Sequence, residues 1–391
     1  RVAQAAACSL SMTLRGRSRY ARMTLSESPP RRAMSAALQA VPVVEHSPSI
    51  DPLEIRPSYD ASPEAYRRLR RKIVEAGLLN RRYGYYLGRT LVSFGMLAAG
   101  LAMAFLAPQT WTWFLATIVV MGVGLAQVAM IGHDCGHLQI FKRASNNWLL
   151  GQFCFSMIVG VGFWSWRDRH NTHHVETNDE DEDPDLSFGG FFTLNEADAA
   201  SRTGLSRLIV RYQAWLFVPV VTSMLSITMR AEGWRFAFQD LHGARRLVEL
   251  SILSLNGLLW LSPALVYGWW WLAVFAGVNA VGGLYLGMTI APNHKGMPTW
   301  AHGTVLTFLE RQVIGSRNIL PGPIAEFVFG GLNYQIEHHL FPNMPRANLG
   351  ACHDIVRPFC LAQGLPYEEV SVWESYRQMF AAFARCGRAT R

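Results

Sequence analysis

Residues 111–137 read WTWFLATIVVMGVGLAQVAMIGHDCGH, an apolar run that ends in two histidines four positions apart. About 20 consecutive apolar residues are enough for a helix to cross the hydrocarbon core of a bilayer, so 111–131 is predicted to be a membrane span. Side chains four positions apart lie on one face of a helix. The stretch therefore predicts a span that presents His133 and His137 together where it leaves the membrane.

Two further clusters, HNTHH at 170–174 and QIEHH at 335–339, bring seven of the twelve histidines into three short motifs. His170, His173 and His174 share a helix face, whereas His338 and His339 point about 100° apart around a helix and could serve different ions. Seven histidines are too many for one ion, so we predict two metals. His294, in APNHKG just after an apolar run, is a candidate eighth ligand. Four more histidines are interpreted as ordinary structural residues: His46, His242, His302 and His353.

The apolar runs predict an all-α integral membrane protein with four transmembrane helices in two hairpins. The predicted spans are 90–107, 111–131, 247–267 and 269–291, the last two joined by Tyr267-Gly268-Trp269. The shorter run 148–164 is predicted to be a re-entrant or interfacial helix, and 214–229 is predicted to lie along the interface. A fifth crossing would put QIEHH on the opposite side of the membrane from HDCGH, and no shared metal site would then form. The segment 343–391 is amphipathic and is expected to complete a cytosolic helical cap around the metals.

Basic residues are concentrated before the first predicted span. Residues 1–89 hold 16 of the 36 lysines and arginines but only 7 of the 28 acids, so the whole net charge of +8 lies there. Positive charge favours the cytoplasmic side, where we predict both termini and the metal site. Residues 1–57 are predicted to be a disordered basic arm, and 58–391 the membrane domain. Without a recognised motif, the arm does not indicate nucleic-acid binding.

Two other features bear on the surroundings of this domain. A predicted helix at 63–78 carries five basic residues suited to anionic headgroups or a CoA phosphate, or simply to solvent: Arg67, Arg68, Arg70, Arg71 and Lys72. The six cysteines form no CxxC pair and are expected to be unpaired thiols.

The ligand set indicates the metal. An all-histidine site excludes iron–sulfur chemistry and lacks the bridging carboxylates of soluble di-iron bundles. Two iron ions that activate O₂ fit the number of nitrogen donors and the membrane position best. Ligand histidines usually need a partner for their second ring nitrogen. Such partners, or in the case of Gln335 a direct ligand, are sought among Gln335, Asn293, Asp134, Glu337, Asn171, Asn333, Asp183 and Asp185. The acidic run 179–185 could equally be a solvated loop.

The three motifs resemble the HxxxH, HxxHH and [HQ]xxHH boxes of the membrane fatty acid desaturases, over a region from about Ser58 to the C-terminus. APNHKGMP and GGLNYQIEHHLFPNMPR look most similar to actinobacterial acyl-CoA desaturases, and the glutamine of the third box is shared with front-end desaturases. The resemblance implies two irons that cycle between Fe²⁺ and Fe³⁺, held by His133, His137, His170, His173, His174, His338 and His339, with His294 as an eighth ligand. Because Gln335 departs from the all-histidine third box, its role is left open.

The resemblance also implies a reaction, the O₂-dependent formation of a cis double bond in a long-chain acyl group, with acyl-CoA favoured over an acyl-lipid. No HPGG haem motif or flavin fingerprint was found, so electrons are expected from a separate ferredoxin, cytochrome or flavin reductase. Phe163, Trp164 and Trp166 are candidates to line an acyl tunnel, although aromatic residues near a membrane are often interface anchors. A di-iron hydroxylase is the alternative enzyme. A membrane metal carrier is a remote one, because no acid or base is expected inside the spans.

Overall fold

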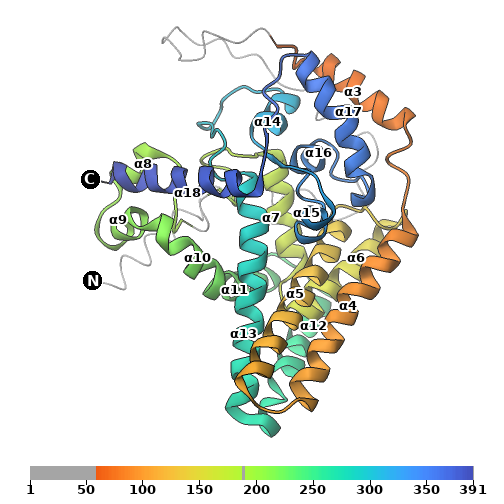
Figure 1. Ribbon diagram of the computed structural model, residues 1–391, viewed down its shortest axis with the longest axis vertical. Coiled ribbons are helices and arrows are strands. Elements are labelled where there is room, and N and C mark those ends of the chain that lie inside the picture. The colour runs from red at the N-terminus through yellow and green to blue at the C-terminus, as the bar shows by residue number, and fades with distance from the viewer. Residues whose placement is uncertain (1–58, 187–189, 391) are drawn as a thin grey trace. The chain divides into compact units, whose positions relative to one another are not determined.

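The computed structural model describes residues 59–186 and 190–390, which lie in one compact unit, Pro57–Arg391. The predicted arm 1–57 lies outside the described residues. Helices make up nearly all of the regular structure in the described part (Figure 1). Its five described cysteines are buried and free, in keeping with the expected thiols.

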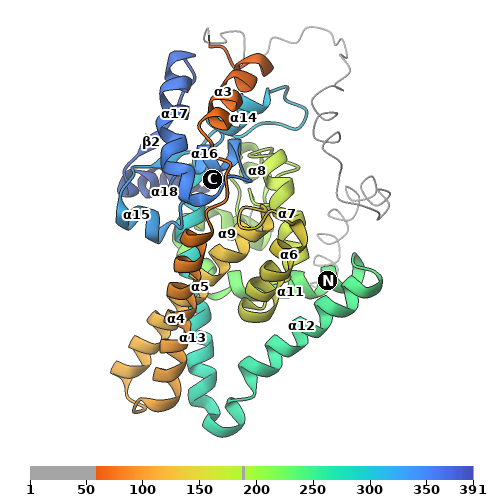
Figure 2. The same ribbon diagram turned by 90° about the vertical axis from the view of Figure 1, so that its right-hand side faces the viewer.

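Three helices are long and apolar enough to cross a membrane: α4 (Tyr83–Leu106), α5 (Trp111–Gly136) and α13 (Ala264–Ile290). They lie side by side in both views (Figures 1 and 2). Glycines allow the close approach, as is common between membrane helices. A Cβ added at Gly122 of α5 would lie 2.7 Å from Val281 of α13, and one at Gly100 of α4 would lie 2.6 Å from Met121 of α5.

The segment predicted as the third span, 247–267, is displaced in the structure. The helix there is α12 (Gly243–Leu261), which ends before Pro263, and its apolar content falls short of a span. The backbone leaves the helical conformation again at Gly268, at φ 58°, inside the predicted turn. The expectation that the spans hold no acid is wrong at Glu249, which is buried on α12. The described chain thus gives three candidate spans, and the number four stays a prediction.

Two bent helix pairs would each make one more span if counted as such. The first, α6 (Ala144–Gln152) continued by the π-helix η2 (Phe153–Val159), meets α7 (Phe163–Val175) at 110°. The second joins α10 (Gln213–Ser223) to α11 (Leu225–Gln239) at 62°. Each pair is a broken span or a re-entrant segment by length and composition. Neither of the runs that were predicted to avoid a straight crossing, 148–164 and 214–229, is therefore a straight helix.

The remaining elements gather at the end of the three long helices where α4 begins and α5 and α13 end (Figure 1). They are α3 (Pro63–Glu75), α8 (Glu196–Ser201), α9 (Gly204–Arg211), α14 (Phe308–Ile314), α15 (Pro323–Val328), α16 (Gln335–Leu340), α17 (Leu349–Ala362), α18 (Val372–Ala389) and the 3₁₀ helices η3 (Ala291–Asn293) and η4 (Arg346–Asn348). Strand β1 (Asn318–Ile319) pairs in parallel with β2 (Glu369–Val370). These elements form the cap that encloses the histidines.

Helix α3 shows how the cap is assembled. Ala65, Leu69 and Ile73 recur every four residues and are fully buried, which gives the helix one apolar face. That face joins a core with Ile336 and Leu340 of α16, the helix that carries the third histidine motif. The five basic residues predicted on this helix all lie on its exposed side.

Candidate metal centre

Each histidine motif lies on a helix at the junction of the cap and the long helices. His133 is in the last turn of α5 and His137 is its C-cap, so the apolar helix ends directly at the site. The second motif lies in the last turns of α7, and the third occupies α16. His294 follows η3 at the end of α13. Four separate segments therefore converge on one buried volume.

The histidines fall into two groups whose potential ligand atoms all lie within 4.8 Å of one another. The first group is His133, His137, His170 and His338, and the second is His173, His294 and His339. The neighbours His338 and His339 belong to different groups, as their angular separation around a helix indicated.

His174 lies between the two groups. Its ring centroid is 4.8 Å from that of His338 and 4.2 Å from that of His339. Its Nε2 is 3.2 Å from Nε2 of His170. The structure therefore brings all eight predicted histidines together, with His174 in a position to serve either group.

Several rings donate their Nδ1 proton to an oxygen outside the cluster. His133 donates to Asp134 at 3.2 Å, and His173 to Asp183 at 2.9 Å. His294 donates to the carbonyl of Gly315 at 3.0 Å, and His339 to Oε1 of Gln312 at 2.8 Å. Each contact fixes the tautomer that leaves the Nε2 lone pair free, which is the usual arrangement around metal-bound histidine.

Ring nitrogens that face the centre are buried and have no hydrogen-bond partner among the described residues: His133 Nε2, His137 Nε2, His174 Nδ1, His338 Nε2 and His339 Nε2. Buried polar atoms in folded proteins are nearly always paired, so this concentration of unpaired ones calls for a shared partner. Burial lowers the pKa of His338 and His339 well below the usual value, and that of His294 to about 3. These three rings are therefore neutral at physiological pH, the form that binds metal ions.

Among the other candidates, Gln335 lies at the second group. Its Nε2 is 2.9 Å from Nε2 of His294, and its Oε1 accepts a hydrogen bond from Asn293 at 3.1 Å. Asp134 also lies 2.7 Å from the buried Arg346. Glu337, in contrast, turns away from both groups, because its carboxylate accepts hydrogen bonds from Asn318 and Tyr367, each at 2.7 Å.

Of the remaining polar candidates, some lie at the metal site and others do not. Asp183 lies at the site, and the acidic run around it is folded inward at this position, not solvated. Asp185 binds Arg169 at 2.6 Å. Asn333 is buried with neither side-chain atom hydrogen-bonded to a described residue. Asn171 is exposed on α7.

The three aromatic candidates occupy different environments. Trp166 stacks on His170 with centroids 4.6 Å apart and also contacts His133. Phe163 is fully buried in the core, and Trp164 packs against it at 5.2 Å.

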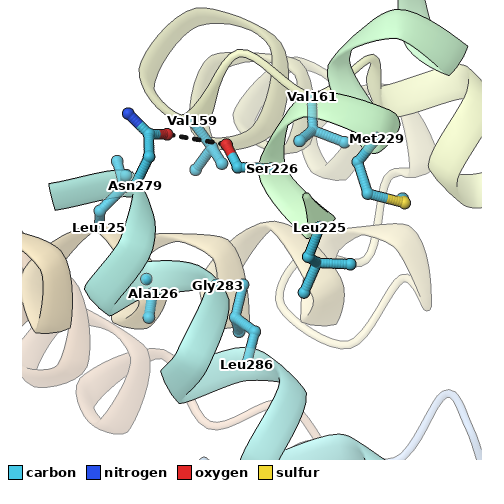
Figure 3. Close-up of a pocket in the computed structure, with 11 residues that line it drawn as sticks. Leu125, Ala126, Val159, Val161, Leu225, Ser226, Met229, Asn279, Gly283 and Leu286 are labelled. Carbon is cyan, nitrogen blue, oxygen red and sulfur yellow. Dashed lines mark hydrogen bonds between the residues drawn. The ribbon is translucent and has the colours of Figure 1, made fainter. Parts of the chain in front are cut away.

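An apolar cavity of about 50 Å³ lies elsewhere, between α5, α11 and α13 (Figure 3). Leu125, Val161 and Leu286 are among its lining residues, and Ser226 donates a hydrogen bond to Asn279 at its edge (Figure 3). Its volume is far below the roughly 300 Å³ at which ligand pockets begin, so it does not hold an acyl chain in this conformation.

Two residues at the site had no signal in the sequence. Gln312 accepts from His339 and donates to the carbonyl of His174 at 2.9 Å, thereby linking α7 to α16. Arg346 contributes the charge that faces Asp134. Gln312 lies in a segment without a motif, and Arg346 ends the stretch GGLNYQIEHHLFPNMPR, where no role was predicted for it; only the fold brings both residues to the histidines.

Comparison with known proteins agrees with this geometry. The sequence profile of the fatty acid desaturase family matches residues 108–371, and the chain belongs to that family. It is 27% identical to the delta-6 fatty acid desaturase of Caenorhabditis elegans, over 80% of this chain and 72% of the relative. It is 28% identical to the delta-8 fatty acid desaturase of Euglena gracilis, over 80% and 78%. An acyl-lipid (9-3)-desaturase of Borago officinalis is 27% identical, over 78% and 71%.

Proposed function

We propose that this protein is a membrane desaturase that uses two histidine-bound iron ions and O₂ to place a cis double bond in a long-chain fatty acyl group. The observation that carries the proposal is the pair of histidine groups, several of whose ring nitrogens are buried without a hydrogen-bond partner among the described residues. Family membership establishes fatty acid desaturation as the reaction class. The number of imidazole donors supports two ions of a transition metal, as do the lowered pKa values of His294, His338 and His339.

The eight histidines and Gln335 are the proposed metal-binding residues. His133, His137, His170 and His338 would hold one iron, and His173, His294 and His339, with Gln335 beside them, would hold the other. His174 would complete either one. Asp134, Asp183, Gln312 and the Gly315 carbonyl orient the rings from outside.

The reaction balances with four electrons. Two hydrogens and their electrons leave adjacent methylene carbons, and a partner protein supplies two more electrons, which enter with two protons. Together these reduce O₂ to two waters. When bound, the irons supply the activation of O₂. The chain's own residues must hold the acyl group with one carbon–carbon bond at the centre and keep bulk water out, since positioning accounts for much of the rate. Trp166 is placed for this, because it covers His133 and His170.

We propose acyl-CoA as the substrate and a separate ferredoxin, cytochrome or flavin reductase as the electron donor, with the metal site and both termini on the cytoplasmic face. The positive charge before α4 supports that orientation. Relatives are named for delta-5, delta-6 and delta-8 desaturation, which favours a new double bond near the carboxyl end of the acyl chain. Others are named for acyl-lipid substrates, so the acyl carrier is a property that the test must resolve.

The test is the fatty-acid profile of cells that express this chain together with a compatible reductase, measured by gas chromatography and mass spectrometry. We expect a new unsaturated acid with the parent chain and none with His170→Ala. His302→Ala is the matched control, because His302 has a side chain 62% exposed and lies outside both groups. A hydroxy acid as the product would move the function to the hydroxylase alternative. An unchanged profile with iron-loaded protein would refute the proposed substrate.

A further inference from the structure

A cluster of four side chains one helical turn before His170 is not used by the metal centre. It comprises Trp148 of α6, Trp164 and Arg167 of α7, and Arg245 of α12. The two indole rings lie 5.6 Å apart. The Arg167 guanidinium lies 5.9 Å from the Trp148 ring and 6.0 Å from the Trp164 ring, and that of Arg245 lies 5.2 Å from Trp164. We name it the tryptophan–arginine cluster.

The cluster holds hydrogen-bond donors that have no acceptor. Trp148 Nε1, Trp164 Nε1 and Arg167 Nε are buried and unpaired with respect to the described residues. Indole and guanidinium groups only donate, so they can pair only with an acceptor. In the part of the chain that the structure describes, Arg167 and Arg245 form no ion pair, and the neighbouring Asp168 is the acid whose charge acts on Arg167. Two guanidinium groups and two indole rings with unpaired N–H groups thus lie together, and this set of donors suits an anion with several oxygens.

The position of Arg245 is built into the fold. Glu249, one turn later on α12, accepts hydrogen bonds from the backbone N–H of Phe163 at 2.9 Å and from Ser156 at 2.8 Å. The beginning of α12 is therefore fixed against the beginning of α7. The side chain of Arg245 itself is exposed, so the cluster opens to the outside. An incoming ligand can reach it without passing through the core.

We propose that the tryptophan–arginine cluster binds the phosphate of the acyl substrate's headgroup, whether CoA or a phospholipid supplies it. Arginine is the side chain best suited to phosphate, because its planar fork donates two parallel hydrogen bonds. Arg167 precedes His170 by three residues, or about 4.5 Å along the helix. Binding here ties the headgroup to the helix that carries the second histidine motif, so the acyl chain extends from a fixed point beside the metal centre. This inference rests on the proposed function for the identity of the ligand.

An interfacial anchor is the competing interpretation, because tryptophan and arginine gather at membrane surfaces. An anchor would serve any lipid equally and would not distinguish ligands with phosphate from those without it. The test therefore measures equilibrium binding of three probes to the full chain in detergent, loaded with metal and without reductant. The probes are stearoyl-CoA, dihexanoyl phosphatidylcholine, and S-stearoyl pantetheine, which carries the acyl thioester but no phosphate.

We expect Arg167→Gln and Arg245→Gln each to weaken binding of one phosphate probe by about tenfold or more, the usual loss for a hydrogen bond to a charged group. Trp164→Phe keeps an aromatic ring but loses the N–H together with the pyrrole part of the indole, and it should weaken the same probe by a smaller factor. Pantetheine binding should not change. The probe that responds identifies the source of the phosphate as CoA or phospholipid.

Arg246→Gln is the matched control, because it makes the same charge change on the same helix but lies over Phe238. Parent-like binding of both phosphate probes by folded Arg167→Gln and Arg245→Gln would overturn the inference and leave the cluster an anchor. Size-exclusion profiles show whether the variants fold. If the parent binds a probe through the cluster yet forms no double bond in cells, the proposed function fails and the binding site stands. If the parent chain forms a double bond in cells but the variants bind both phosphate probes as the parent does, the proposed function stands and the binding site fails.

Discussion

Asp183 accepts a hydrogen bond from Nδ1 of His173 at 2.9 Å and is 5% exposed. It also accepts from the backbone N–H groups of Asn178 and Asp185, both at 2.8 Å. The carboxylate is therefore fixed by the loop that contains it, and it in turn fixes the ring of His173. A loop that looks like a solvated acidic run in the sequence thus orients a metal-site histidine.

The first prediction concerns this pair. Asp183→Asn preserves the shape but lowers the basicity of the acceptor and leaves the tautomer of His173 less defined. Loss of such a partner typically reduces metal affinity or activity by 10–100-fold. We expect a loss of this size in iron affinity, measured by competition with a chelator. Asp181→Asn, at an exposed position of the same loop, is the control, and an equal loss there would contradict the role of Asp183.

The second prediction concerns Gln335. Because its amide faces Nε2 of His294, we expect Gln335→Met to lower the iron content from about two toward one per chain, while Gln335→His retains both. Elemental analysis of the purified protein measures this directly. Gln363→Met on the far end of α17 serves as the control. Two irons in Gln335→Met would show that the amide only orients His294.

Much of this centre follows from spacing, and the rest does not. The spacing within HDCGH and HNTHH predicts that each motif presents its histidines on one helix face, and the number of histidines predicted that α5 and α7 would meet at shared metals. Gln312 and the Gly315 carbonyl were not, because a contact made by one residue from a distant segment leaves no local pattern. Asp134 was predictable as a neighbour of His133, but its Arg346 partner was not.

The membrane spans were likewise predictable only in part. The apolar run 111–131 predicted α5 well, and the helix merely continues to Gly136 with the histidine motif. The run 247–267 predicted the wrong helix boundaries, because hydropathy does not take account of Pro263, which lacks an N–H and ends α12 early. Glu249 stands within the sequence of that run, and what could not be predicted is its burial, because its three donors, Gln152, Ser156 and the N–H of Phe163, come together only in the fold.

The third prediction tests the close packing behind the first motif. A Cβ at Gly136 would lie 2.4 Å from the Trp166 ring, which stacks on His170. Gly136→Ala must therefore displace Trp166, and overpacking of this kind costs about 1–3 kcal/mol. We expect a lower unfolding temperature in detergent together with lower iron content. Gly95→Ala on α4 meets no atom within 4 Å and should leave both unchanged or slightly improved.

The last prediction uses the buried carboxylate that the centre does not employ. Burial raises the pKa of Glu337, and the hydroxyl of Tyr367 and the amide of Asn318 supply donors that oppose this shift. Tyr367→Phe leaves the ionised carboxylate with one donor fewer, a loss of about 1–3 kcal/mol for a buried charged acceptor. The protonated carboxyl does not bear this penalty. Because the variant raises the folded-state pKa further, its stability deficit should be small at pH 5 and grow as the pH rises toward 8. Thermal unfolding of the variant and parent across this range measures the difference, with the exposed Tyr83→Phe as the control. A deficit that is the same at both pH values would mean that Glu337 does not change protonation over this range, and it would contradict a pH-dependent role of the Tyr367 hydroxyl.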